Sequence, residues 1–142
     1  MGIHQLIENR IFWAAIIAWL SAQFIKVMFT IISEKKIDIS RMYGAGGMPS
    51  SHSALVTAMT ANIGKIYGLG EPIFAVCCVF TMIVMYDAAG VRRAAGKQAK
   101  AINLLFMHTD LKFEEQLKEL LGHTPLQVFC GAVLGIAIGC FF

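Results

Sequence analysis

The stretch IFWAAIIAWLSAQFIKVMFTII, residues 11–32, is an apolar run that only Gln23 and Lys26 interrupt. A helix of this length can cross a bilayer, whose hydrocarbon core is roughly 30 Å thick. The rest of the chain has the same character: 57% of its 142 residues are hydrophobic, 15% are charged, and the mean hydropathy is +0.66. Soluble domains of this size rarely have such a composition. The sequence therefore predicts an all-α integral membrane protein.

Three further apolar segments follow, at residues 53–69, 72–91 and 125–142. Residues 94–121 mix leucines with lysines and glutamates, a pattern typical of an amphipathic segment at a membrane surface. No repeat or low-complexity tract divides the chain. We therefore expect a helical bundle of about four transmembrane helices plus an amphipathic interfacial segment, forming a single membrane-embedded domain over residues 1–142.

A stripe of polar and aromatic side chains follows the first span at helical spacing. Its members are Trp19, Gln23, Lys26, Thr30 and Ser33, separated by steps of four and three residues. Such steps place side chains on one face of a helix. Snorkelling towards the lipid headgroups would account for Lys26 alone but not for the whole stripe. We therefore expect this stripe to face the interior of the bundle.

Antiparallel packing of four spans would bring most charged residues to one face. That face collects Lys26, Lys35, Lys36, Arg41, His52, Asp87, Arg92, Arg93, Lys97, Lys100 and His123. The positive-inside rule then predicts that this face is cytoplasmic. A site that binds anions would also gather cations there, so both explanations stay open.

Asp87 lies near the end of the third apolar segment. An unpaired carboxylate at the centre of a span costs roughly 2.5–3.5 kcal/mol, so we expect it to have a partner. Its neighbours at i+3 and i+4 are Gly90 and Val91, which predicts that neither Arg92 nor Arg93 pairs with it along one helix. The partner should then lie on another element, in a structural salt bridge or in a catalytic site.

Two histidines stand where apolar segments begin. Ser50 or Ser51 can cap the second helix, and the N–H groups of its first turn would then face an anion. His52 lies in that first turn, and His123 precedes the Thr124-Pro125 start of the fourth segment. Either histidine alone is compatible with a structural role. Together with the surrounding cations, the pair predicts a phosphate site.

Phosphoryl transfer would suit such a site. Arginine and lysine can stabilise the negative oxygens of the phosphoryl group. One neutral imidazole can attack the phosphorus, and a second can protonate the leaving oxygen. This chemistry requires no metal, so we expect neither a metal ion nor another cofactor.

These residues also carry a family resemblance. PSSHS, residues 49–53, resembles the Pro-Ser-Gly-His motif of the type 2 phosphatidic acid phosphatase and vanadium haloperoxidase superfamily, and GHTP, residues 122–125, resembles its third motif. AQFIK, residues 22–26, and YDAAGVRRAAG, residues 86–96, are similar to a small divergent branch of that superfamily, made of bacterial and plant membrane proteins. The resemblance covers nearly the whole chain.

The resemblance implies a membrane phosphatase that hydrolyses a lipid phosphate or a polyprenyl (di)phosphate through a phosphohistidine intermediate. It also implies a bacterial plasma membrane as the location. His123 matches the nucleophile, and His52 matches the acid that protonates the leaving group. The expected phosphate-binding positions are Lys26, Arg41, Ser50, Ser51, Arg92 and Arg93.

Two departures from the family pattern concern the third motif. Leu117 stands where the family has an arginine, and Gln127 stands where an aspartate orients the histidine. We expect Arg92 or Arg93 to supply the missing guanidinium. We expect Asp87, as a third catalytic residue, to supply the missing carboxylate. Both substitutions are our inference and not part of the family pattern.

The same departures keep two other functions open. One is a catalytically silent membrane protein that binds or transports a phosphorylated lipid or another anion, and the other is a structural subunit. Gly131, Gly135 and Gly139 form two overlapping GxxxG units, which are typical of close helix packing. Their partner is either inside the chain or in a second copy, which would make a homodimer. We expect a lipid phosphate substrate and the membrane as partners, and we expect no nucleic acid partner.

Overall fold

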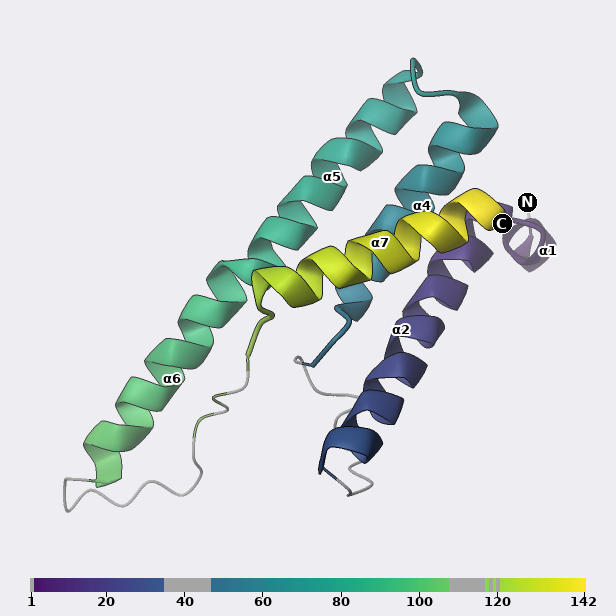
Figure 1. The fold of residues 1–142 in the computed structure, drawn as a ribbon. Helices are drawn as coiled ribbons and strands as arrows, with labels where there is room; N and C mark the ends of the chain where they lie inside the picture. Colours follow the sequence, from purple (N-terminus) through teal and green to yellow (C-terminus); the bar gives the residue numbers. More distant parts are fainter. Residues whose placement is uncertain (1, 35–46, 108–116, 118, 120) are drawn as a thin grey trace.

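The computed structural model describes residues 2–34, 47–107, 117, 119 and 121–142. This part of the chain contains helices and connecting segments only, which confirms the all-α prediction for it (Figure 1). The helices are α1 (Ile3–Ile7), α2 (Arg10–Glu34), α4 (Ser51–Tyr67), α5 (Pro72–Ala89), α6 (Val91–Met107) and α7 (Pro125–Phe141).

The apolar segments of the sequence correspond to α2, α4, α5 and α7. By length and apolar composition, two stretches of the described residues could cross a bilayer: Arg10–Ile32 in α2, and Pro72–Met107, which joins α5 and α6. Helix α7 is apolar but shorter, and α4 also has 17 residues. The short helix α1 was not predicted.

Helix α4 lies at the centre of the bundle, in contact with α2, α5 and α7 (Figure 1). Small side chains allow these backbones to approach closely. Ala54 and Ala58 of α4 and Ala18 and Ala22 of α2 are fully buried in one cluster. Because its neighbours cover it, α4 can carry more polar residues than the outer helices.

The glycine stripe of α7 packs against α4 of the same chain. Gly131, Gly135 and Gly139 are all buried. A Cβ atom at Gly131 would overlap the Ser50 carbonyl, and one at Gly135 would overlap the Ala54 carbonyl. Helix α4 of the same chain, and not a second copy, therefore packs against this glycine stripe. The homodimer stays a prediction, and it would require another surface.

Side-chain hydrogen bonds join α4 to its neighbours inside the apolar bundle. Asn62 Nδ2 donates to the Gly139 carbonyl of α7 at 3.0 Å. The Thr60 and Thr81 hydroxyls lie 2.8 Å apart and connect α4 with α5. Such bonds satisfy polar groups that have no water partner in an apolar environment, and they fix the register of the helices.

Two basic side chains donate hydrogen bonds to the C-terminal end of α7, at the end of the bundle opposite the predicted site. Lys65 Nζ donates to the Cys140 carbonyl at 2.9 Å, and the Arg10 guanidinium donates to the Phe142 carbonyl. Positive charge is favourable at a helix C-terminus because the last carbonyls lack helical partners. These two cations therefore hold α7 in place.

A break at Gly90 separates α5 from α6. Helix α5 ends at Ala89, before the predicted end of the third span, and α6 begins at Val91. Figure 1 shows α6 extending beyond the other helices in roughly the direction of α5. We expected the 94–121 segment to lie along a membrane surface. If α5 spans the bilayer, α6 instead leads away from that surface, and most of residues 108–120 lie outside the described part.

Candidate active site

The two histidines predicted to act together lie close together. His52 is in the first turn of α4, and His123 directly precedes the N-cap of α7. Their ring centroids are 6.3 Å apart, and the ring planes are tilted by 60°. A nucleophile and an acid that each contact a phosphoryl group at about 3 Å would have a similar separation. His123 is buried, whereas His52 is exposed.

Backbone hydrogen bonds hold the starts of α4 and α7 together. Ser50 N–H donates to the Gln127 carbonyl at 3.0 Å. His123 N–H donates to the Ala88 carbonyl in the last turn of α5 at 2.9 Å. Main-chain contacts at the helix ends therefore help to set the position of each histidine.

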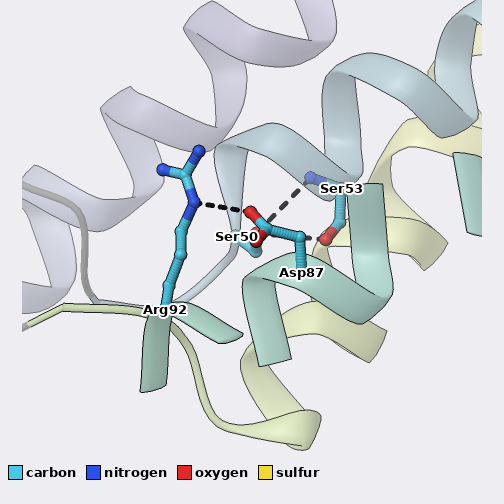
Figure 2. A network of polar contacts seen from close by, with 4 residues as sticks. All are labelled: Ser50, Ser53, Asp87 and Arg92. Atoms are coloured by element: carbon cyan, nitrogen blue, oxygen red, sulfur yellow. Dashed lines mark hydrogen bonds and ion pairs between the residues drawn. The ribbon is translucent and has the colours of Figure 1, made fainter. Parts of the chain in front are cut away.

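The N-cap of α4 is Ser50, one of the two predicted candidates. Its hydroxyl accepts hydrogen bonds from the Ser53 N–H at 3.4 Å and from the Ser53 hydroxyl at 3.0 Å (Figure 2). Within the described residues, the N–H groups of Ser51 and His52 have no acceptor. They are available to an anion at the helix N-terminus. Ser51 itself is buried.

Lys26 brings a buried positive charge to the two histidines. Its side chain is only 2% exposed, and Nζ donates to Gln23 Oε1 at 2.9 Å. The lysine interacts electrostatically with both imidazoles. Thr30 is buried on the same face, so the prediction of an inward polar stripe is confirmed for this part of α2. Trp19 is 37% exposed and does not belong to the buried stripe.

Gln127 orients the His123 ring. Gln127 Oε1 lies 3.3 Å from His123 Nδ1, and it also accepts a hydrogen bond from the Thr124 N–H at 3.0 Å. Because the Thr124 N–H needs an acceptor, this atom is the amide oxygen and His123 Nδ1 is the donor. In the neutral ring the lone pair is then on Nε2. Gln127, and not Asp87, thus contacts the ring of His123.

His123 is biased towards this neutral form. Burial is the main cause that lowers the pKa of His123 below its ordinary value of 6.5. The hydrogen bond to Gln127 opposes this effect, the positive charges of Lys26 and His52 add to it, and the Gly47 carbonyl opposes it. The net direction is downward, so the imidazole is unprotonated at neutral pH and can act as a nucleophile.

Asp87 forms a salt bridge with Arg92, which we had excluded. Arg92 Nε donates to Asp87 Oδ2 at 2.7 Å, and both side chains are partly exposed (Figure 2). The prediction was wrong because it assumed one continuous helix through Gly90. The break turns Arg92 back towards Asp87. Both groups of this pair also act electrostatically on His52, so the pair belongs to the same site.

A cavity of about 360 Å³ opens beside His123. Gln127 and three cations of α6, Arg93, Lys97 and Lys100, also line it. Of these cations, only Arg93 was predicted as a site residue. Lys97 follows Arg93 by four residues and Lys100 follows Lys97 by three, so helical spacing could have predicted these two lysines as well. Arg41 lies outside the described residues.

The comparisons with known proteins cover most of the chain. The sequence model of the divergent PAP2 family matches residues 7–138. The chain is 40% identical, over 94% of its length, to the uncharacterized membrane protein YuiD of Bacillus subtilis (strain 168), and the alignment covers 94% of that protein. No solved structure matches the chain.

Proposed function

This chain belongs to the divergent PAP2 family, and we propose that it is an integral membrane phosphatase. Its substrate would be a lipid phosphate or a polyprenyl (di)phosphate, hydrolysed through a phosphohistidine without a metal ion. The observation that carries the proposal is the pair of imidazoles, His52 and His123, with centroids 6.3 Å apart beside the buried Lys26.

The first step forms the phosphohistidine. His123 Nε2 attacks the phosphorus with its lone pair, and the bond between phosphorus and the ester oxygen breaks. The departing oxygen takes a proton from the imidazolium of His52 and leaves as an alcohol, or as a phosphate in the case of a diphosphate. In the second step His52 takes a proton from water, the resulting hydroxide attacks phosphorus, and inorganic phosphate leaves His123.

Positive groups stabilise the phosphoryl oxygens during both steps. Lys26 supplies a charge that burial keeps from being screened by water. Arg92 contacts Asp87 through Nε, so its two terminal nitrogens are left to donate to phosphate oxygens. Asp87 thereby acts as a positioning residue for Arg92. The N–H groups of Ser51 and His52 would add donors at the start of α4.

The proposed membrane arrangement has four spans, α2, α4, α5 and α7, with the site at the cytoplasmic face. The hydropathy of α2 and α5 supports two of these spans, and the name of the relative YuiD supports a membrane location. Helices α4 and α7 have 17 residues, at the lower end of the range for spanning helices. A lipid phosphate at the headgroup level would then reach the histidines directly.

One observation favours an alternative in which the chain binds a phosphorylated lipid without hydrolysing it. Gln127 is uncharged, so it stabilises an imidazolium at His123 less than an aspartate would. If attack by His123 is too slow for this reason, the ester bond stays intact and the chain only binds or transports the lipid.

Release of inorganic phosphate tests the proposal. The purified protein in detergent is given phosphatidic acid, a polyprenyl phosphate and a polyprenyl diphosphate. We expect turnover that EDTA does not affect and vanadate inhibits. His123→Asn should reduce kcat at least about a thousandfold, whereas His4→Asn, on the exposed helix α1, should not. Lack of turnover with every substrate, together with tight substrate binding, would favour the alternative function.

A further inference from the structure

The cavity beside His123 has a cationic wall that the proposed reaction does not use. Arg93, Lys97 and Lys100 line this wall. Their spacing of four and three residues puts them on one face of α6. At a rise of 1.5 Å per residue, they extend over about 10 Å along the helix. Helix α6 extends beyond the other helices (Figure 1). The row of cations on it therefore leads away from the bundle.

The three positive charges on this wall outnumber the carboxylates among the described lining residues of the cavity, of which Glu119 is the only one. Arg92 is paired with Asp87, but none of the three wall cations has an ion-pair partner among the described residues. The carboxylate that lines the same cavity, Glu119, accepts a hydrogen bond from Asn103 Nδ2 at 2.9 Å. Three like charges around one cavity repel each other, and a bound anion relieves that repulsion.

Close backbone contacts fix the shape of the cavity. A Cβ atom at Gly96 would overlap the Glu119 carbonyl, and one at Gly122 would overlap the Arg93 backbone nitrogen. Gly122 also has a φ of +83°, a conformation that glycine adopts without strain. The backbones of Glu119 and Gly122 are therefore in close contact with α6. The volume of about 360 Å³ is in the range of small-molecule sites and exceeds what one phosphoryl group needs.

We propose that Arg93, Lys97 and Lys100 form a second anion subsite next to the phosphate position at His123. This inference rests on the proposed function for the position of the reacting phosphate. The substrate class is then a phosphate ester that carries an additional negative group within about 10 Å of the reacting phosphorus, on the side away from the bundle. A lipid diphosphate and a lipid phosphate with an acidic headgroup share this chemistry.

A binding experiment tests the subsite independently of catalysis. Calorimetry in detergent compares methylenediphosphonate, which is not hydrolysed, with inorganic phosphate. We expect the diphosphonate to bind the wild type about tenfold more tightly, since each exposed lysine contributes roughly two- to fivefold. Lys97→Gln/Lys100→Gln should remove this preference. The charge-matched control Lys97→Arg/Lys100→Arg should keep it. Equal affinities in the wild type would overturn the subsite.

An activity experiment identifies the source of the second anion. The kcat/KM values for a polyprenyl diphosphate and for phosphatidylglycerol phosphate are compared with that for phosphatidic acid. The double glutamine variant should lose about tenfold on at least one of the first two and less than about twofold on the last. An equal loss on all three would overturn the subsite. Absence of turnover in the wild type would refute the phosphatase, while the binding experiment would still decide the subsite.

Discussion

Gln127 holds the nucleophile of the proposed reaction through an uncharged group. Its amide oxygen accepts from both the His123 ring and the Thr124 N–H, so the helix cap and the imidazole share one acceptor. This contact fixes the tautomer as well as a carboxylate would. It does not offer the negative charge that would favour the protonated ring.

Replacing this amide by a carboxylate should shift the pH dependence of the reaction. The acid limb of kcat/KM reports protonation of the free His123, which has no lone pair on Nε2 once protonated. Because the pKa of His123 is lowered, the wild-type limb should lie below pH 6.5. Gln127→Glu should move the limb upwards by about one to two pH units. Gln127→Leu removes the hydrogen bond that raises the pKa, so its limb should move downwards. Identical limbs in all three proteins would refute this role.

Loss of the Asp87 carboxylate should affect turnover more than stability. The pair with Arg92 is partly exposed, so Asp87→Asn should change the free energy of unfolding by less than about 1 kcal/mol. It should lower kcat/KM by about tenfold or more, because Arg92 loses its fixed orientation. Asp87→Glu should restore part of the activity. A double-mutant cycle with Arg92→Lys should show coupling in kcat/KM, and additive effects would argue against positioning.

The interface between α4 and α7 is the element contact on which the site depends most directly. Both helices bring a histidine at their N-terminal ends, and glycines allow the two backbones to touch. A shift of one helix along the other would separate the imidazoles. The packing of this pair and the geometry of the site are therefore linked.

A larger side chain in the interface between α4 and α7 should disturb both the helix packing and the geometry of the site. A Cβ at Gly135 would already overlap the Ala54 carbonyl and the Thr57 hydroxyl. Gly135→Leu should lower stability by about 1–3 kcal/mol, measured as a fall of Tm in detergent, and should reduce turnover. Ala137→Leu is the matched control, because Ala137 is exposed on the same helix. Equal Tm values for the two variants would contradict the importance of this packing.

The elements differ in how well the sequence predicts them. Hydropathy and capping signals located α2, α4 and α7 to within about two residues, because each of these helices starts at a proline, a serine or a polar cluster. The end of α5 lies two residues before the predicted one, but the break at Gly90 was not predicted, because apolar Val91 continues the hydrophobic pattern. The pairing of Asp87 with Arg92 depends on that break, so spacing rules for a continuous helix could not find it. The proximity of the histidines was predicted, since alternating spans place both helix starts on one face.

At the scale of the whole molecule, both ends of the bundle carry cations, but these cations have different surroundings. Arg10 and Lys65 at one end donate to carbonyls of α7. At the other end, the cations surround the histidines and the cavity. This asymmetry agrees with a fixed orientation in a membrane.

Thiol labelling of intact bacterial cells would determine that orientation. In a variant with its four cysteines replaced, Gln98→Cys in α6 and Glu71→Cys before α5 lie beyond opposite ends of α5. We expect a membrane-impermeant maleimide to label position 71 in intact cells and position 98 only after permeabilisation. Labelling of both positions from the same side would contradict a spanning α5. The reversed pattern would place the site outside the cytoplasm.

The hydrogen bond from the His123 N–H to the Ala88 carbonyl attaches the proposed nucleophile to a helix other than the one it precedes. Ser50 is attached to Gln127 in the same manner. Three helix ends thus have to keep their relative heights for the imidazoles to remain in register. Lipids with short acyl chains, which force spanning helices to tilt by different amounts, would pull these ends apart. The rate of the protein in reconstituted vesicles would consequently depend on acyl-chain length even where the headgroup of the substrate is the same.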